Sequence, residues 1–253
     1  MKHSIPKILS IFLFAGALFS AFSMRAELLD ETFDWKHLEE LKLGYYIGSF
    51  DPIHLGHQDV IDQALSKYVD YVLIYPVPGG DQFKNRTDLK LRQKMIASIY
   101  QDHPKVLITY WTPKELQLKF NSCAFSVDIL GIIGSDVVTE NLMSSDVEVS
   151  EKYRAVFMRG ITLKEKHTQD TIGALMALKA NSFLVALRGD IDLSYLEGQI
   201  DDRPIYAFIQ SKNNSSTEVR NAIRDKKSFE QFLSLSVQTI IKQEGLYEFS
   251  FQN

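Results

Sequence analysis

The 253-residue sequence lacks several features that mark particular protein classes. Its single cysteine, Cys123, allows no internal disulfide and no cysteine cluster around a metal. Basic residues show no excess, and the net charge of -4 argues against a broad nucleic-acid surface. No repeat, low-complexity tract or linker divides the chain. What remains, 45% hydrophobic and 24% charged residues, is typical of a soluble globular protein with one full core.

The first 26 residues differ in composition from the rest. Lys2 and Lys7 precede the uncharged run Ile8–Phe22. Ala21-Phe22-Ser23 has the small-x-small spacing of a cleavage site, and Met24-Arg25-Ala26 is a poorer alternative. This order predicts a secretory signal peptide, 1–23 or 1–26, and hence an exported protein, either periplasmic or secreted. Two alternatives are an uncleaved anchor that holds the protein at a membrane and a misassigned start codon in a cytoplasmic protein.

Residues 27–253 alternate between apolar runs and segments of helical periodicity. The predicted strands are 43–47, 71–75, 106–110, 127–133, 155–158, 183–187 and 205–209. The predicted helices are 56–68, 89–100 and 168–179, and residues 216–243 are predicted to be helical in two or three pieces. This alternation predicts an α/β fold: a single domain with a doubly wound parallel sheet, Rossmann-like, covered on both faces. Polar motifs at 48–57, 134–136 and 159–160 each follow a strand, so we expect them to converge on one crevice.

The motif Gly48–His57 begins with a turn suited to phosphate. Gly48 permits a tight turn and the close approach of a ligand, because it has no Cβ. Ser49 and Phe50 then offer backbone N–H groups. A helix beginning near Gly56 adds unpaired N–H groups and a partial positive charge. The segment therefore predicts a phosphate-binding loop.

Two histidines stand at the start of the same helix. His54 and His57 are three residues apart, so their rings can point to one side. Two donors aimed at one phosphate would stabilise the charge that develops during displacement at phosphorus. The alternatives are two structural histidines, or half of a zinc site for which no third ligand stands out.

The segment Asn214–Arg220 is the second candidate motif. Ser215, Ser216 and Thr217 precede a helical pattern, which predicts an N-terminal cap. A cap alone would explain these residues. The same helix start also presents N–H groups and hydroxyls to an anion, and Arg220 could grip a phosphate with two hydrogen bonds.

Gly48–His57 resembles the His-x-Gly-His signature of the nucleotidyltransferase superfamily. Its wording, Gly-Ser-Phe-Asp-Pro-Ile-His-Leu-Gly-His, is most similar to the nicotinate- and nicotinamide-nucleotide adenylyltransferases, and pantetheine-phosphate adenylyltransferase has similar wording. Ser215–Arg220 looks like the family's Ser-Ser-Thr-x-x-Arg element, which holds the β- and γ-phosphates of ATP. Weaker matches are Gly134-Ser-Asp136, to a nucleotide-contacting element, and Arg159-Gly160, to an Arg-x-Gly element. The resemblance extends over about residues 43–247.

The resemblance implies transfer of AMP from ATP to a small phosphorylated acceptor, with release of pyrophosphate. It gives catalytic roles to His54, His57 and Arg220. The implied nucleotide-binding residues are Gly48, Ser49, Phe50, Gly56, Gly134, Asp136, Arg159, Ser215, Ser216 and Thr217. The resemblance also implies Mg²⁺ held by phosphate oxygens and water, with no protein ligand set. Lys84 and Arg92 fall where the family places basic residues, which implies contact with the substrate phosphate; a solvated loop and helix face is the alternative.

The identity of the acceptor stays open. Bacterial nicotinate-nucleotide adenylyltransferases usually carry tryptophans that can stack on the pyridine ring, and residues 137–154 contain none. Nicotinate or nicotinamide mononucleotide is the leading acceptor and pantetheine phosphate the second. A cytidylyltransferase ranks third, because Lys212–Thr217 does not match that group's element. The other class is an exported, non-catalytic nucleotide-binding protein, favoured by the signal peptide and the missing tryptophans.

Overall fold

A computed structural model describes residues 42–78, 86–109, 111–122, 127–135, 175, 178–189, 198–200 and 203–248. The predicted signal peptide, the predicted strand 155–158 and most of the predicted helix 168–179 lie outside these residues, and the domain boundary at 27 stays a prediction. None of the helices in the described ranges combines the length and the apolar character needed to cross a membrane.

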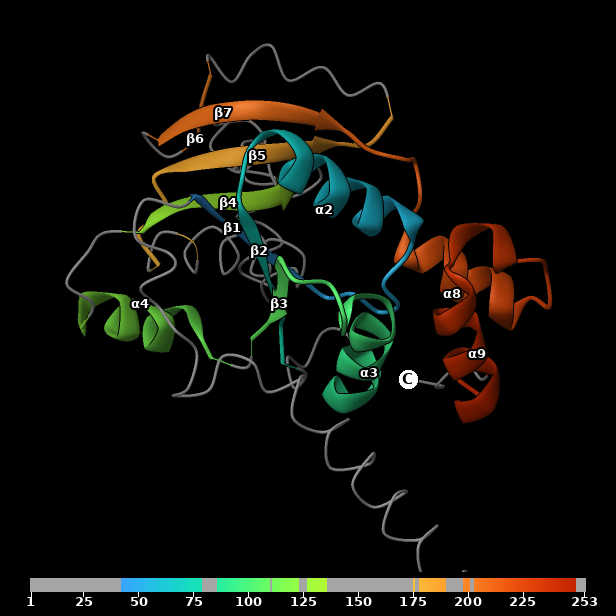
Figure 1. The fold of residues 1–253 in the computed structure, drawn as a ribbon. Helices are drawn as coiled ribbons and strands as arrows, with labels where there is room; N and C mark the ends of the chain where they lie inside the picture. The colour runs from blue at the N-terminus through green and yellow to red at the C-terminus, as the bar shows by residue number, and fades with distance from the viewer. Residues whose placement is uncertain are drawn as a thin grey trace, which may run out of the picture.

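The described elements alternate between strands and helices for most of the chain (Figure 1). In order they are β1 Lys42–Gly48, α2 Leu55–Lys67, β2 Tyr71–Pro76, α3 Leu89–Tyr100, β3 Val106–Ile108, α4 Pro113–Ser122, β4 Asp128–Gly134, β5 Ser182–Leu187, β6 Gln199–Ile200, β7 Arg203–Gln210, α8 Ser216–Arg224, the 3-10 turn η3 Glu230–Phe232 and α9 Leu235–Glu244. Two elements, α4 and β6, were not predicted. The helical segment 216–243, predicted in two or three pieces, consists of α8, η3 and α9.

The strands form one sheet in the order β3-β2-β1-β4-β5-β7-β6. All pairings from β3 through to β7 are parallel, and only the two-residue β6 pairs antiparallel with β7. The predicted parallel α/β sheet is therefore confirmed. Strand β1 pairs with β2 on one side and β4 on the other, so the direction of winding reverses there. Doubly wound sheets bind ligands outside the carboxyl ends of the strands at this point, which is where Gly48 begins its turn.

Side chains on β2 alternate between the two faces of the sheet, as the period of a strand requires. Val72 and Ile74 belong to an apolar cluster with residues of α2, α3, α8 and α9. Leu73 and Tyr75 belong to a second cluster with α4 and with Leu175. Helical residues therefore cover both faces, and Figure 1 shows α2 lying across the strands with α8 and α9 beyond its N-terminal end.

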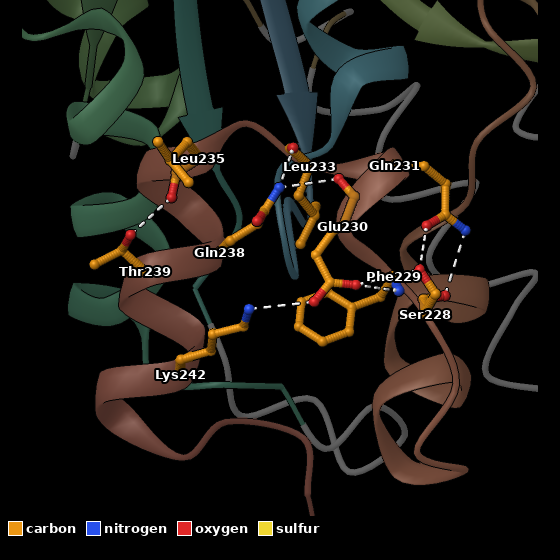
Figure 2. A network of polar contacts seen from close by, with 9 residues as sticks. All are labelled: Ser228, Phe229, Glu230, Gln231, Leu233, Leu235, Gln238, Thr239 and Lys242. Atoms are coloured by element: carbon orange, nitrogen blue, oxygen red, sulfur yellow. Dashed lines mark hydrogen bonds and ion pairs between the residues drawn. The ribbon is translucent and has the colours of Figure 1, made fainter.

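A polar network fixes the turn between α8 and α9 (Figure 2). The Gln238 side chain donates hydrogen bonds to the backbone oxygens of Glu230 and Leu233, both at 2.9 Å. The Glu230 carboxylate accepts from the Phe229 backbone N–H at 3.0 Å and from the Lys242 ammonium at 3.2 Å. These bonds hold η3 against α9, so the residues that follow α9 have a defined position near the turn after β1.

Candidate active site after the first strand

The turn after β1 is tightly packed. Phe50 is 1% exposed and has a positive φ of 49°, an uncommon conformation for a residue other than glycine. Its ring lies edge-on to Tyr46 and His57, at centroid distances of 5.1 and 5.0 Å. A Cβ on Gly48 would come within 3.1 Å of that ring. Gly48 thus allows the close packing of Phe50, a reason that the sequence did not reveal.

The two histidines lie face to face, as predicted from their spacing. Their ring centroids are 3.7 Å apart with an interplanar angle of 24°. His54 is the N-cap of α2: its Nδ1 accepts the backbone N–H of His57 at 3.3 Å, and Nδ1 of His57 accepts the backbone N–H of His54 at 3.2 Å. Because both Nδ1 atoms are acceptors, we assign the ring proton of each neutral imidazole to Nε2.

Burial keeps both imidazoles neutral. His54 is 1% exposed and His57 is 7% exposed. Burial, together with the positive charge of Arg188, lowers the pKa of His54 to about 3. Burial lowers the pKa of His57 well below its usual range, with smaller contributions from His54 and Arg188. The buried Nε2 of His54 has no hydrogen-bond partner among the described residues. A buried donor of this kind requires an acceptor, and a phosphate oxygen would supply one.

The second motif contacts the first directly. The Ser216 hydroxyl donates to the Pro52 carbonyl at 3.0 Å, across 164 positions of sequence. One nitrogen of Arg220 donates to the Asp51 carbonyl at 2.6 Å and the other to the Thr217 hydroxyl at 3.1 Å. The α8 N-terminus therefore lies beside the histidine turn.

The predicted cap of α8 is confirmed as well. Ser215 is the N-cap residue, and its hydroxyl accepts the backbone N–H of Thr217 at 3.2 Å. The first backbone N–H groups of this nine-residue helix therefore lie where the two motifs, Gly48–His57 and Asn214–Arg220, meet.

Arg92 supports the same turn from α3. It is fully buried, with Nε donating to the Thr87 carbonyl at 2.9 Å and a terminal nitrogen donating to the Ser49 carbonyl at 2.7 Å. Nε of Arg86 donates to the Ser49 hydroxyl at 3.1 Å. Burial lowers the pKa of Arg92, and the Asp51 charge opposes that shift. The alternative of a solvated helix face is therefore wrong for Arg92, whereas its contact with a substrate phosphate stays a prediction.

The structure places only some of the remaining predicted site residues. Gly134 ends β4, buried beside Ala186 of β5. Asp136, Arg159 and Lys84 lie outside the described residues. Gly56 lies in the first turn of α2, where a Cβ would come within 2.9 Å of the Lys212 carbonyl and 3.1 Å of the His54 ring. It is thus needed for the contact between the two motifs.

Two residues of the site were missed from the sequence. Asp51 is 2% exposed, and its carboxylate accepts the Tyr247 hydroxyl at 2.6 Å and the Thr87 N–H at 3.1 Å. Arg188 follows β5 directly and acts on the pKa of both histidines. The rule that polar residues after a strand gather at one edge could have found Arg188. Asp51 lies within the motif Gly48–His57, but nothing in that pattern indicated its contact with Tyr247. Among the described residues, no group of three histidine, cysteine or acidic side chains could hold a metal.

A parallel α/β sheet with neutral imidazole donors at its switch point, facing a capped helix start, defines the protein as a nucleotidyltransferase. The chain belongs to the cytidylyltransferase-like family, whose model matches residues 45–222, more than half of the sequence. It is 22% identical to a probable nicotinate-nucleotide adenylyltransferase of Fusobacterium nucleatum over 212 residues, which cover 81% of this chain and 98% of that protein. It is 26% identical to the phosphopantetheine adenylyltransferase of Francisella tularensis subsp. novicida over 128 residues, 46% of this chain and 77% of that protein.

The fold is also similar to a solved structure. The Plasmodium falciparum nicotinic acid mononucleotide adenylyltransferase complexed with NaAD matches with a TM-score of 0.55. The sequence identity is 18%, and the match covers 83% of this chain and 99% of the other. At this identity the likeness concerns the fold.

Proposed function

We propose that the protein transfers AMP from ATP to a phosphate-bearing acceptor and releases pyrophosphate. Nicotinate or nicotinamide mononucleotide is the leading acceptor, which would make the reaction a step of NAD biosynthesis. The observation that carries this proposal is the stacked, neutral pair His54 and His57, whose Nε2 donors stand at the start of α2 beside the second motif. The adenylyltransferases among the relatives support AMP as the transferred group.

The negative charge that develops during the reaction lies on the α-phosphoryl oxygens, which the two Nε2–H groups would face. The acceptor phosphate attacks the α-phosphorus in line, and negative charge grows on the oxygens of the crowded phosphoryl group. The Nε2–H groups of His54 and His57 donate to those oxygens, and a neutral donor fixed in a buried site stabilises charge without reorganisation. The N-terminus of α8, with Ser216, Thr217 and Arg220, holds the β- and γ-phosphates. Asp136 and Arg159 are proposed to position the nucleotide.

The site fits a magnesium ion carried by the substrate. Asp51 is the buried carboxylate of the turn, and both of its oxygens already accept hydrogen bonds, from Tyr247 and Thr87. The ion would therefore be held by phosphate oxygens and water. When bound, Mg²⁺ neutralises charge on the phosphate chain and on the leaving pyrophosphate.

The relatives favour a second acceptor, pantetheine phosphate, because one of them is a phosphopantetheine adenylyltransferase. The assay therefore measures pyrophosphate release by the full chain with ATP and Mg²⁺, against nicotinate mononucleotide, nicotinamide mononucleotide and pantetheine phosphate separately. A parallel series replaces ATP with CTP. We expect release with ATP and a pyridine mononucleotide, and a product of the mass of the dinucleotide. Binding of a non-hydrolysable ATP analogue without release for any acceptor would favour a non-catalytic nucleotide-binding protein.

The role of the histidine pair is tested by His57→Asn. The asparagine oxygen can replace Nδ1 as acceptor for the His54 N–H, while the Nε2 donor is lost. We expect kcat to fall roughly 10²–10³-fold, as for removal of one donor to a developing oxyanion. Substitution of exposed His103 by asparagine is the control and should leave kcat unchanged. Unchanged turnover in His57→Asn would remove the assigned role.

We also propose that residues 1–26 direct the protein out of the cytoplasm, on the composition of that segment alone. Fractionation of the cells that produce the full chain, with the mass of the recovered protein, tests this. A mature protein that begins near residue 24 or 27 supports a signal peptide. A protein of full mass in the cytoplasmic fraction contradicts export.

A further inference from the structure

Asp51 ties three segments, distant in sequence, to the histidine turn. Its Oδ1 accepts the Tyr247 hydroxyl at 2.6 Å, and its Oδ2 accepts the Thr87 N–H at 3.1 Å. Its backbone carbonyl accepts the Arg220 guanidinium at 2.6 Å. Two of these contacts fix the carboxylate and the third fixes the peptide, so both the side chain and the backbone of Asp51 have set positions.

The Tyr247 contact is a strong one. The half-buried Tyr247 donates to a carboxylate that is 2% exposed, and hydrogen bonds to a charged acceptor are about twice as strong as neutral ones. Burial and the Asp51 charge raise the pKa of Tyr247, so the hydroxyl keeps its proton and remains a donor. The bond joins positions 196 residues apart.

The backbone at Tyr247 is in an unfavourable conformation. Its φ is +68°, in the left-handed region that residues other than glycine rarely adopt. Such a conformation persists only where the surrounding structure holds it. The polar network of η3 and α9 fixes the chain before this turn (Figure 2), and the bond to Asp51 fixes the turn itself.

Asp51 stands three residues before His54, within the same short turn. The ring of Phe50 packs against His57, and each Nδ1 is already used within the pair. Among the described residues, the turn and its contacts therefore carry much of the support for the two rings. Movement of Asp51 would therefore tilt the Nε2 atoms that are proposed to face the α-phosphate. Misplacement of a catalytic group by about 1 Å can cost roughly 10²-fold in rate.

We propose that Tyr247 is a positioning residue for phosphoryl transfer: through Asp51 it holds the turn that aims His54 and His57. This inference rests on the proposed function. Tyr247 itself does not contact the substrate in this proposal. Its effect concerns the transition state, since the histidines meet charge that develops only there, whereas ATP binding depends mainly on the α8 side of the site.

The test is Tyr247→Phe, which keeps the ring and removes the hydroxyl. We expect kcat to fall about 10- to 100-fold while the KM for ATP changes less than about threefold. Tyr100→Phe is the matched control, because the buried Tyr100 hydroxyl has no hydrogen-bond partner among the described residues. It should leave kcat unchanged. Wild-type kcat in a folded Tyr247→Phe variant would overturn the proposal.

A double-mutant cycle with Asp51→Asn tests the route of the effect. If Tyr247 acts through Asp51, the second substitution adds little to the first, so the two losses in kcat are not multiplicative. Multiplicative losses would show two independent effects and would contradict positioning through Asp51.

A measurement without nucleotide separates this proposal from the function on which it rests. The ¹⁵N chemical shifts of the His54 and His57 ring nitrogens should change in Tyr247→Phe and stay at their wild-type values in Tyr100→Phe. Unchanged shifts in Tyr247→Phe would overturn the positioning role. If the wild-type protein releases no pyrophosphate with any acceptor, the proposed function fails, and the shifts alone decide whether Tyr247 orients the pair.

Discussion

The buried imidazole of His54 makes the stability of the protein depend on pH. Its pKa is about 3 in the folded protein and 6.5 ordinarily. Between these values the unfolded chain binds a proton that the folded chain does not, so acid favours unfolding. The contribution of His54 to the free energy of unfolding is complete above pH 6.5 and is lost as the pH falls toward 3. Each pH unit in this window costs about 1.4 kcal/mol.

The perturbation is His54→Asn, which removes the titrating ring and keeps a side chain that caps helices well. Urea denaturation at pH 7.5 and 4.5 gives the free energy of unfolding of both proteins. Two pH units of linkage below 6.5 amount to about 3 kcal/mol. We therefore expect the difference in free energy of unfolding, variant minus wild type, to be larger at pH 4.5 than at pH 7.5 by about that amount. His57 is present in both proteins, so the effect of its own protonation largely cancels in the difference between them.

The control is Val60→Ala, a buried position on the same helix without a titratable group. It should lower stability by a similar amount at both pH values, as expected for the loss of buried methyl groups. If the difference between wild type and His54→Asn is the same at pH 7.5 and 4.5, the imidazole is not held neutral by burial, and the reasoning fails.

Two further substitutions test the packing of the site and of its support. Gly56→Ala places a Cβ within 2.9 Å of the Lys212 carbonyl and 3.1 Å of the His54 ring; we expect kcat/KM to fall more than about 10-fold, and a wild-type value would show that the contact can relax. Gln238→Met removes both side-chain hydrogen bonds to η3 and should lower the free energy of unfolding by about 1–2 kcal/mol. Thr239→Val on the exposed side of the same helix is its control and should change stability by less than about 0.5 kcal/mol.

The parallel strands were predictable because each is buried on both faces and therefore reads as a continuous apolar run. Helix α4 was not, and its residues show why. Only Leu116 and Phe120 pack into the second cluster, while Leu118 between them is 61% exposed. Pro113 is buried as well but belongs to neither cluster, and two core positions in ten residues give too weak a period to identify a helix.

The candidate site divides in the same way. The spacing of His54 and His57 predicted that both rings could point to one side. The resemblance of their motif and of the α8 cap to elements of one family indicated that the two motifs act together. Asp51 and Tyr247 meet only because α9 packs beside α3 and the chain then turns back. A contact between residues so distant follows from the packing of the whole fold, and local sequence patterns carry no record of it.

The bond between Tyr247 and Asp51 also sets an order of events during synthesis. The ribosome makes Gly48–His57 early, whereas a domain generally folds as a unit. A nascent chain that ends before α8 already contains both histidines and most strands of the sheet. It lacks Arg220 and Tyr247, so two of the three anchors of Asp51 are missing. The site is therefore completed only after translation has passed residue 247, and a truncated product of the same gene would carry the histidine motif without its support.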